Sequence, residues 1–152
     1  MTDTGDPWLI DAMWRAVDLT RAYAAGDRSR VATCVTGLDT PRLERVLSWL
    51  ALEHDEHFDA LGEPSMGVRE IDTTAALAPP EIEFATTTAL RRVAAGETGL
   101  ARAVVDLAPH ERVHAIATFL TVTLVEAYGR PAALERLDEK TAEYERAGYP
   151  RP

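Results

Sequence analysis

The sequence feature that most constrains the fold is the stretch 109–128, PHERVHAIATFLTVTLVEAY. Between Val113 and Tyr128 its only charged side chain is Glu126. Apolar residues at helical spacing cover one side of this stretch, and further apolar residues cover the other. A helix that is apolar nearly all round is a buried one. The stretch therefore predicts a central helix, roughly 30 Å long, wrapped by the rest of the chain.

Composition places the chain among globular proteins. It has 152 residues and 46% apolar side chains, which predict a single folded domain covering residues 1–152 with a substantial core. Its net charge of −9 disfavours binding to nucleic acids and to anionic membranes. The apolar run in 109–128 is interrupted by His114, threonines and Glu126, so we do not expect it to span a membrane.

Cysteine usage and the first residues bear on the compartment. Cys34 is the only cysteine, so no internal disulfide can form, which fits a reducing environment. The start of the chain, MTDTGDPW, is acidic and lacks the apolar core of a secretory signal. These features predict a cytoplasmic protein.

Helix-start and helix-stop residues divide the chain. Asp6-Pro7, Asp27 and Thr40-Pro41 are typical of helix starts, and Gly26 is typical of a helix end. No segment shows clear strand alternation, so we predict an all-α compact bundle of about seven helices. The expected helices are 7–25, 27–36, 40–61, 80–95, 98–107, 109–128 and 131–147. Segment 62–79, which contains Pro64, Gly67 and Pro79, is expected to be an irregular crossover.

The two halves of the chain resemble one another. Segment 21–27, RAYAAGD, aligns with segment 91–97, RRVAAGE, and the apolar positions of the long helices after them align as well. Each half then reads as long helix, short helix, long helix, which predicts pseudo-repeats at 7–61 and 80–128 plus a C-terminal helix at 131–147. Chance alignment of amphipathic helices is the alternative, and the sequence leaves both open.

The sharpest chemical motif is His110-Glu111-Arg112-Val113-His114. Two histidines four residues apart on a helix can share a zinc ion, and the glutamate between them can act as a general base. This pentapeptide resembles the zincin metalloprotease signature, which would make Glu111 catalytic and His110 and His114 metal ligands. No third ligand is evident, because Glu126 lies roughly 18 Å further along the same helix. A structural interpretation is that Glu111 stabilises the helix N-terminus.

A second metal hypothesis joins both histidine pairs. His54 or His57 would supply a third ligand to His110 and His114 if the helix ends meet. One histidine on an early helix and a His-x-x-x-His pair on a later one is similar to the DinB-like four-helix metalloproteins. Paired histidines on a solvated acidic face are the simpler interpretation.

Rich apolar patterning with few convergent polar groups favours a non-enzymatic protein-interaction or regulatory module. Its expected partner is another protein or a second copy in a homodimer, and no cofactor is expected. Candidate surfaces are the acidic end of the third helix around Glu53–Asp59, segment 62–79 and the exposed side of the last helix. A zinc-dependent hydrolase or DinB-like metalloprotein is the alternative, with zinc as its metal. A pocket for an apolar small molecule beside the central helix is a third option that the sequence leaves open.

Overall fold

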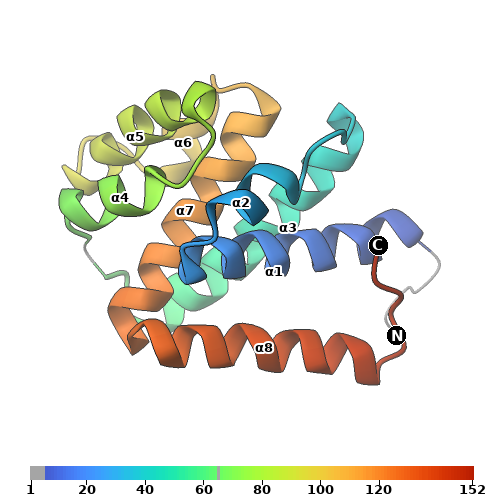
Figure 1. The fold of residues 1–152 in the computed structure, drawn as a ribbon. Coiled ribbons are helices and arrows are strands. Elements are labelled where there is room, and N and C mark those ends of the chain that lie inside the picture. Colours follow the sequence, from blue (N-terminus) through green and yellow to red (C-terminus); the bar gives the residue numbers. More distant parts are fainter. Residues whose placement is uncertain (1–5, 65) are drawn as a thin grey trace.

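A computed structural model describes residues 6–64 and 66–152, and within these ranges the chain is all-α, with eight helices and no strands (Figure 1). The compact helical bundle predicted from the sequence is confirmed. Each helix in the described ranges is too short or too polar to serve as a membrane span. The helices are α1 (Pro7–Ala25), α2 (Arg28–Thr33), α3 (Thr40–Ala60), α4 (Val68–Ala75), α5 (Pro80–Ala94), α6 (Leu100–Val104), α7 (Pro109–Tyr128) and α8 (Arg130–Arg146).

Helix α7 is the centre of the bundle, as its apolar sequence predicts. Every residue from Val113 to Leu124 is buried, and α1, α3, α4, α5 and α8 all pack against it. Two buried threonines bond back to their own helix, where the Oγ1 atoms of Thr121 and Thr123 donate to the carbonyl groups of Ala117 and Phe119 at 2.7 and 2.9 Å. These bonds let polar side chains lie in the core at little cost.

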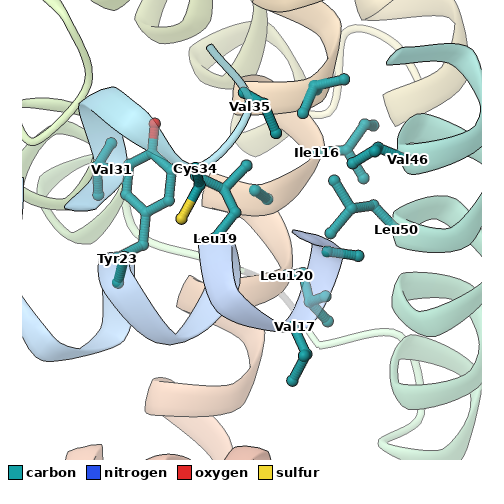
Figure 2. Close-up of a cluster of buried hydrophobic side chains, with 14 of the residues drawn as sticks. Val17, Leu19, Tyr23, Val31, Cys34, Val35, Val46, Leu50, Ile116 and Leu120 are labelled. Carbon is teal, nitrogen blue, oxygen red and sulfur yellow. The ribbon is translucent and has the colours of Figure 1, made fainter. Parts of the chain in front are cut away.

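Helix α1 begins and ends where its sequence indicates. The Asp6 carboxylate accepts a hydrogen bond from the Trp8 backbone N–H at 2.9 Å, and Gly26 adopts the left-handed conformation, with φ of 70°. Between these caps, α1 packs against α3, α7 and α8. Figure 2 shows side chains from α1, α3, α7 and the α2 region meeting in this core, with Val46 of α3 and Ile116 of α7 turned toward the same interior.

The prediction of an irregular crossover at 62–79 is wrong, because the segment contains α4. This helix brings the number in the described ranges to eight, close to the about seven expected. Ile71 and Ala75 of α4 are fully buried, while Val68 is 43% exposed. Proline and glycine do bound this helix, but the eight residues between Gly67 and Ala76 are enough for two helical turns. Asp72 of α4 also pairs with Arg91 of α5 at 2.7 Å.

Two groups of helices lie around α7. Figure 1 shows α8 along the lower side of the bundle, next to α1, and α4, α5 and α6 together at its upper left. Leu137 and Tyr144 bury the apolar face of α8, which covers α1 and α7. The order long, short, long occurs in α1–α3 and again in α5–α7. Whether this order reflects a duplication stays a prediction.

Candidate functional site

His114, the second histidine of the zincin-like motif, lies in the core beside α1. It is 2% exposed, and its Nδ1 lies 2.6 Å from the Tyr23 hydroxyl oxygen in a hydrogen bond. Burial, with a smaller contribution from the charge of His110, lowers the pKa of His114 to about 4. Burial also raises the pKa of Tyr23 well above its ordinary value. The pair is therefore neutral at physiological pH and joins α1 to α7.

Glu111 acts at the start of α7 as a helix cap. Its Oε1 accepts a hydrogen bond from the Ala108 backbone N–H at 2.8 Å, which satisfies a donor that the helix leaves free. His110, one residue earlier, is partly exposed. Glu111 is thus positioned to stabilise the helix N-terminus, as the structural interpretation of this motif expects.

The other histidine pair lies on α3. The His54 ring stacks on Phe58 with centroids 5.0 Å apart and meets Phe119, in the middle of α7, edge-on at 5.2 Å. Its Nδ1 lies 3.0 Å from Asp55 Oδ1. His57 faces Glu53 at 3.7 Å, and burial lowers its pKa. Across residues 6–64 and 66–152, no group of three or more His, Cys, Asp or Glu side chains is arranged to hold a metal ion.

Cys34 offers no nucleophile to a site. Its side chain is buried, and burial raises the pKa of the thiol to about 11. The thiol therefore stays protonated at physiological pH, and only the thiolate is strongly nucleophilic.

An apolar groove runs between α3 and α6, and we call it the α3–α6 groove. It encloses about 260 Å³. His54 is one of the polar residues that line this groove. Its Nε2 atom is buried and has no hydrogen-bond partner in the described part of the chain. The groove is lined by Leu47, Ala51, His54, Asp55, Leu100, Ala101, Val104, Val105, Arg112 and Ile116.

A second pocket, of about 180 Å³, lies where α8 meets α1, α3 and α7, and we call it the α8 pocket. Its floor is apolar, and its rim carries both signs of charge. Glu53, whose side chain is 14% exposed, pairs with Lys140 at 3.1 Å on this rim. Two buried polar atoms of its lining residues, Trp49 Nε1 and the Tyr144 hydroxyl oxygen, have no hydrogen-bond partner among the described residues.

The α8 pocket was not predicted from the sequence, in which Trp49 and Tyr144 belong to the apolar faces of two separate helices. The available signal was that each carries one polar atom that needs a partner when buried. No local spacing connects a residue of α3 with one of α8, so only the packing of the helices shows that they meet.

Comparison with known proteins finds no protein-family model, no curated protein and no solved structure that matches the chain. The function of these sites is therefore argued from their geometry alone.

Proposed function

We propose that this protein is a non-enzymatic interaction module that holds a basic amphipathic helix of a partner protein in the α3–α6 groove. The observation that carries the proposal is the apolar lining of this groove beside an exposed acidic face of α3. Helix-in-groove binding is a common mode of peptide recognition, in which apolar residues at i, i+3, i+4 and i+7 enter the groove.

Exposed apolar side chains support an apolar contact here. Val105, which lines the groove, is 59% exposed, and Leu52 of α3, which is outside the lining, is 62% exposed. Large apolar residues exposed beside a groove indicate a binding surface more often than scattered single ones do. A partner helix that covered Val105 would remove its side chain from water.

Charge favours a basic partner over a second copy of this chain. The exposed residues of α3 include Glu44, Asp55 and Asp59, and Asp55 lines the groove together with Arg112 of α7. Lysine or arginine residues flanking the apolar stripe of a partner helix would be attracted to this face. A second copy carries a net charge of −9, so self-association through this face is opposed by repulsion.

The neighbours of the motif residues also support a non-enzymatic role. Glu111 caps α7, and His114 is bonded to Tyr23 in the core. A general base needs a free carboxylate within reach of a water or substrate proton. Both side chains instead have partners that explain their presence structurally.

The test uses a fluorescently labelled peptide with leucine at i, i+3, i+4 and i+7 and lysine on its flanks, titrated at physiological ionic strength. We expect saturable binding by fluorescence anisotropy. Ala101→Arg should weaken peptide binding about tenfold or more, because the new side chain obstructs the groove and repels lysine. A tenfold loss of affinity corresponds to ~1.4 kcal/mol of binding free energy. Ala127→Arg adds the same charge to an exposed position on α7 outside the groove, and should change the affinity less than about twofold.

Two results would overturn this proposal. A scrambled peptide of equal charge that binds equally well would show that binding is only electrostatic. Light scattering that detects a dimer of the unmodified protein, lost in Ala101→Arg, would show that a second copy occupies the groove.

The alternative function, a zinc hydrolase or DinB-like metalloprotein, has its own test. We expect elemental analysis of the purified protein to find no stoichiometric zinc, and His110→Ala to leave the metal content unchanged. His110 is the appropriate position because it is partly exposed, whereas replacing the buried His114 would also disturb the core. One zinc per chain that disappears in His110→Ala would favour the metalloprotein.

A further inference from the structure

Helix α5 carries an aromatic ring on its outward face. Phe84 is 81% exposed, more than any other large apolar side chain in the described ranges. The helix lies at the periphery of the bundle (Figure 1), and Phe84 lines a shallow surface depression of about 290 Å³. Burying such a ring against a partner is favourable, because it removes a large apolar surface from water. The depression is lined by Pro80, Glu83, Phe84, Thr87, Thr88 and Arg91.

The charges of α5 are sorted along its length. Glu81 and Glu83 lie in its first turn, and Arg91 and Arg92 lie in its last turn. This order suits the dipole of the helix itself. It also makes the helix complementary to a second copy in the antiparallel direction, because the acidic start of each copy would face the basic end of the other. A partner with charge of one sign would match only one end of α5.

Helical geometry gives a register for such a pair. At 3.6 residues per turn, Phe84 and Arg91 lie about 20° apart around the helix axis, and so do Glu81 and Arg92. Each pair therefore lies along one line of the helix. A two-fold axis near Thr87 would bring each member of a line opposite the other member in the second copy. Both pairs have their midpoint within one residue of Thr87, so a single axis satisfies both.

The arginines are positioned to meet a second copy. The Arg91 guanidinium is held by two hydrogen bonds to the Asp72 carboxylate, at 3.0 and 2.7 Å, while its side chain stays 55% exposed. A guanidinium with a fixed orientation can stack on an aromatic ring and loses little further freedom on binding. Arg92 contacts Glu97 at only 3.8 Å, and both side chains are more than half exposed. Arg92 can therefore turn toward another carboxylate.

We propose that α5 is a homodimer interface at which two copies of this chain pack antiparallel about a two-fold axis near Thr87. The Phe84 ring of each copy lies on the Arg91 guanidinium of the other, and Glu81 pairs with Arg92 across the axis. Because α5 has only 15 residues and each copy carries a net charge of −9, the dimer is weak, with a Kd on the order of 10–100 µM. The surface shares no lining residue with the α3–α6 groove, so the two proposals stand or fall separately.

Analytical ultracentrifugation of the whole chain, from about 1 µM to about 1 mM, tests the dimer over a range that brackets this Kd. We expect a monomer–dimer equilibrium. Phe84→Ala should weaken it about tenfold or more, because each dimer loses two buried rings. Leu52→Ala removes an apolar side chain that is 62% exposed on α3, and should change the Kd less than about twofold. Circular dichroism of each variant verifies that it is folded.

A pair of charge reversals tests the register. Glu81→Arg and Arg92→Glu each place like charges opposite one another, and each should weaken its own dimer at least about fivefold. The first variant has arginine at both positions and the second has glutamate at both. An equimolar mixture should therefore associate about as well as the unmodified protein. Glu145→Arg makes the same change of charge at an exposed position on α8, and mixing it with Arg92→Glu should not restore association.

Four results would overturn the proposal. A monomer throughout the concentration range would show that α5 does not pair. Equal Kd values for the unmodified protein and folded Phe84→Ala would place the dimer contact on another surface. A mixture of the two charge reversals that associates no better than either alone would exclude the antiparallel register. A dimer that Ala101→Arg dissociates and Phe84→Ala does not would place the second copy in the α3–α6 groove.

Discussion

Replacing Ile71 of α4 by alanine is expected to lower the free energy of unfolding by roughly 2–5 kcal/mol. Ile71 is fully buried in a small core cluster with Met66, Leu90, Phe119 and Val122. Truncation removes apolar contacts and leaves a cavity that the surrounding helices fill only in part. Urea denaturation followed by circular dichroism at the helical band measures the change.

Val68→Ala is the matched control for this substitution. Val68 lies three residues earlier on the same helix but is 43% exposed, so its truncation should cost less than about 1 kcal/mol. If Ile71→Ala cost no more than Val68→Ala, segment 62–79 would be only loosely attached to the bundle, and the sequence-based prediction of an irregular crossover would regain support.

The second large effect concerns pH. His114 has a pKa of about 4 in the folded protein and an ordinary value of 6.5 when unfolded. Between these values the unfolded chain binds more protons than the folded one, so acid favours unfolding. The stability that neutral His114 provides is complete above pH 6.5 and is lost as the pH falls toward 4. The expected loss is about 3 kcal/mol, since each pKa unit corresponds to ~1.4 kcal/mol.

His114→Gln isolates this contribution from other titrating groups. Glutamine does not titrate, so the stability difference between the unmodified protein and the variant should narrow by about 3 kcal/mol between pH 7 and pH 4. Burial also lowers the pKa of His57. Through His57, acid lowers the free energy of unfolding of both proteins, and this effect cancels in the difference between them. A difference that does not change with pH would mean that His114 is protonated as easily in the folded protein as in the unfolded chain.

Much of the fold could be predicted because its determinants are local. The apolar run of α7, the Asp6 cap and the left-handed Gly26 are each visible in a few consecutive residues. Helix α4 was not predicted because Gly67 and Pro79, which are typical of irregular segments, lie on either side of its short apolar pattern. Val68, Ile71 and Ala75 do recur at helical intervals, and two of them are fully buried.

The candidate sites were harder to predict because they depend on which helices meet. The sequence favours a site at His110, Glu111 and His114, whose spacing matches a known motif. In the structure, Glu111 caps its own helix and His114 bonds to Tyr23 of α1. Trp49 and Tyr144 belong to helices that are far apart in the sequence. Their shared lack of partners becomes evident only once α8 is packed against α1 and α7.

The residues after α8 return to the first helix. The Trp14 indole N–H donates to the Tyr149 carbonyl at 3.3 Å, and Arg151 pairs with Asp18 while lying over the Trp14 ring at 4.1 Å. During synthesis on the ribosome, α1 emerges more than 100 residues before these partners. Its α8-facing side must therefore stay open to water, or to a chaperone, until α8 and the residues after it have left the ribosome.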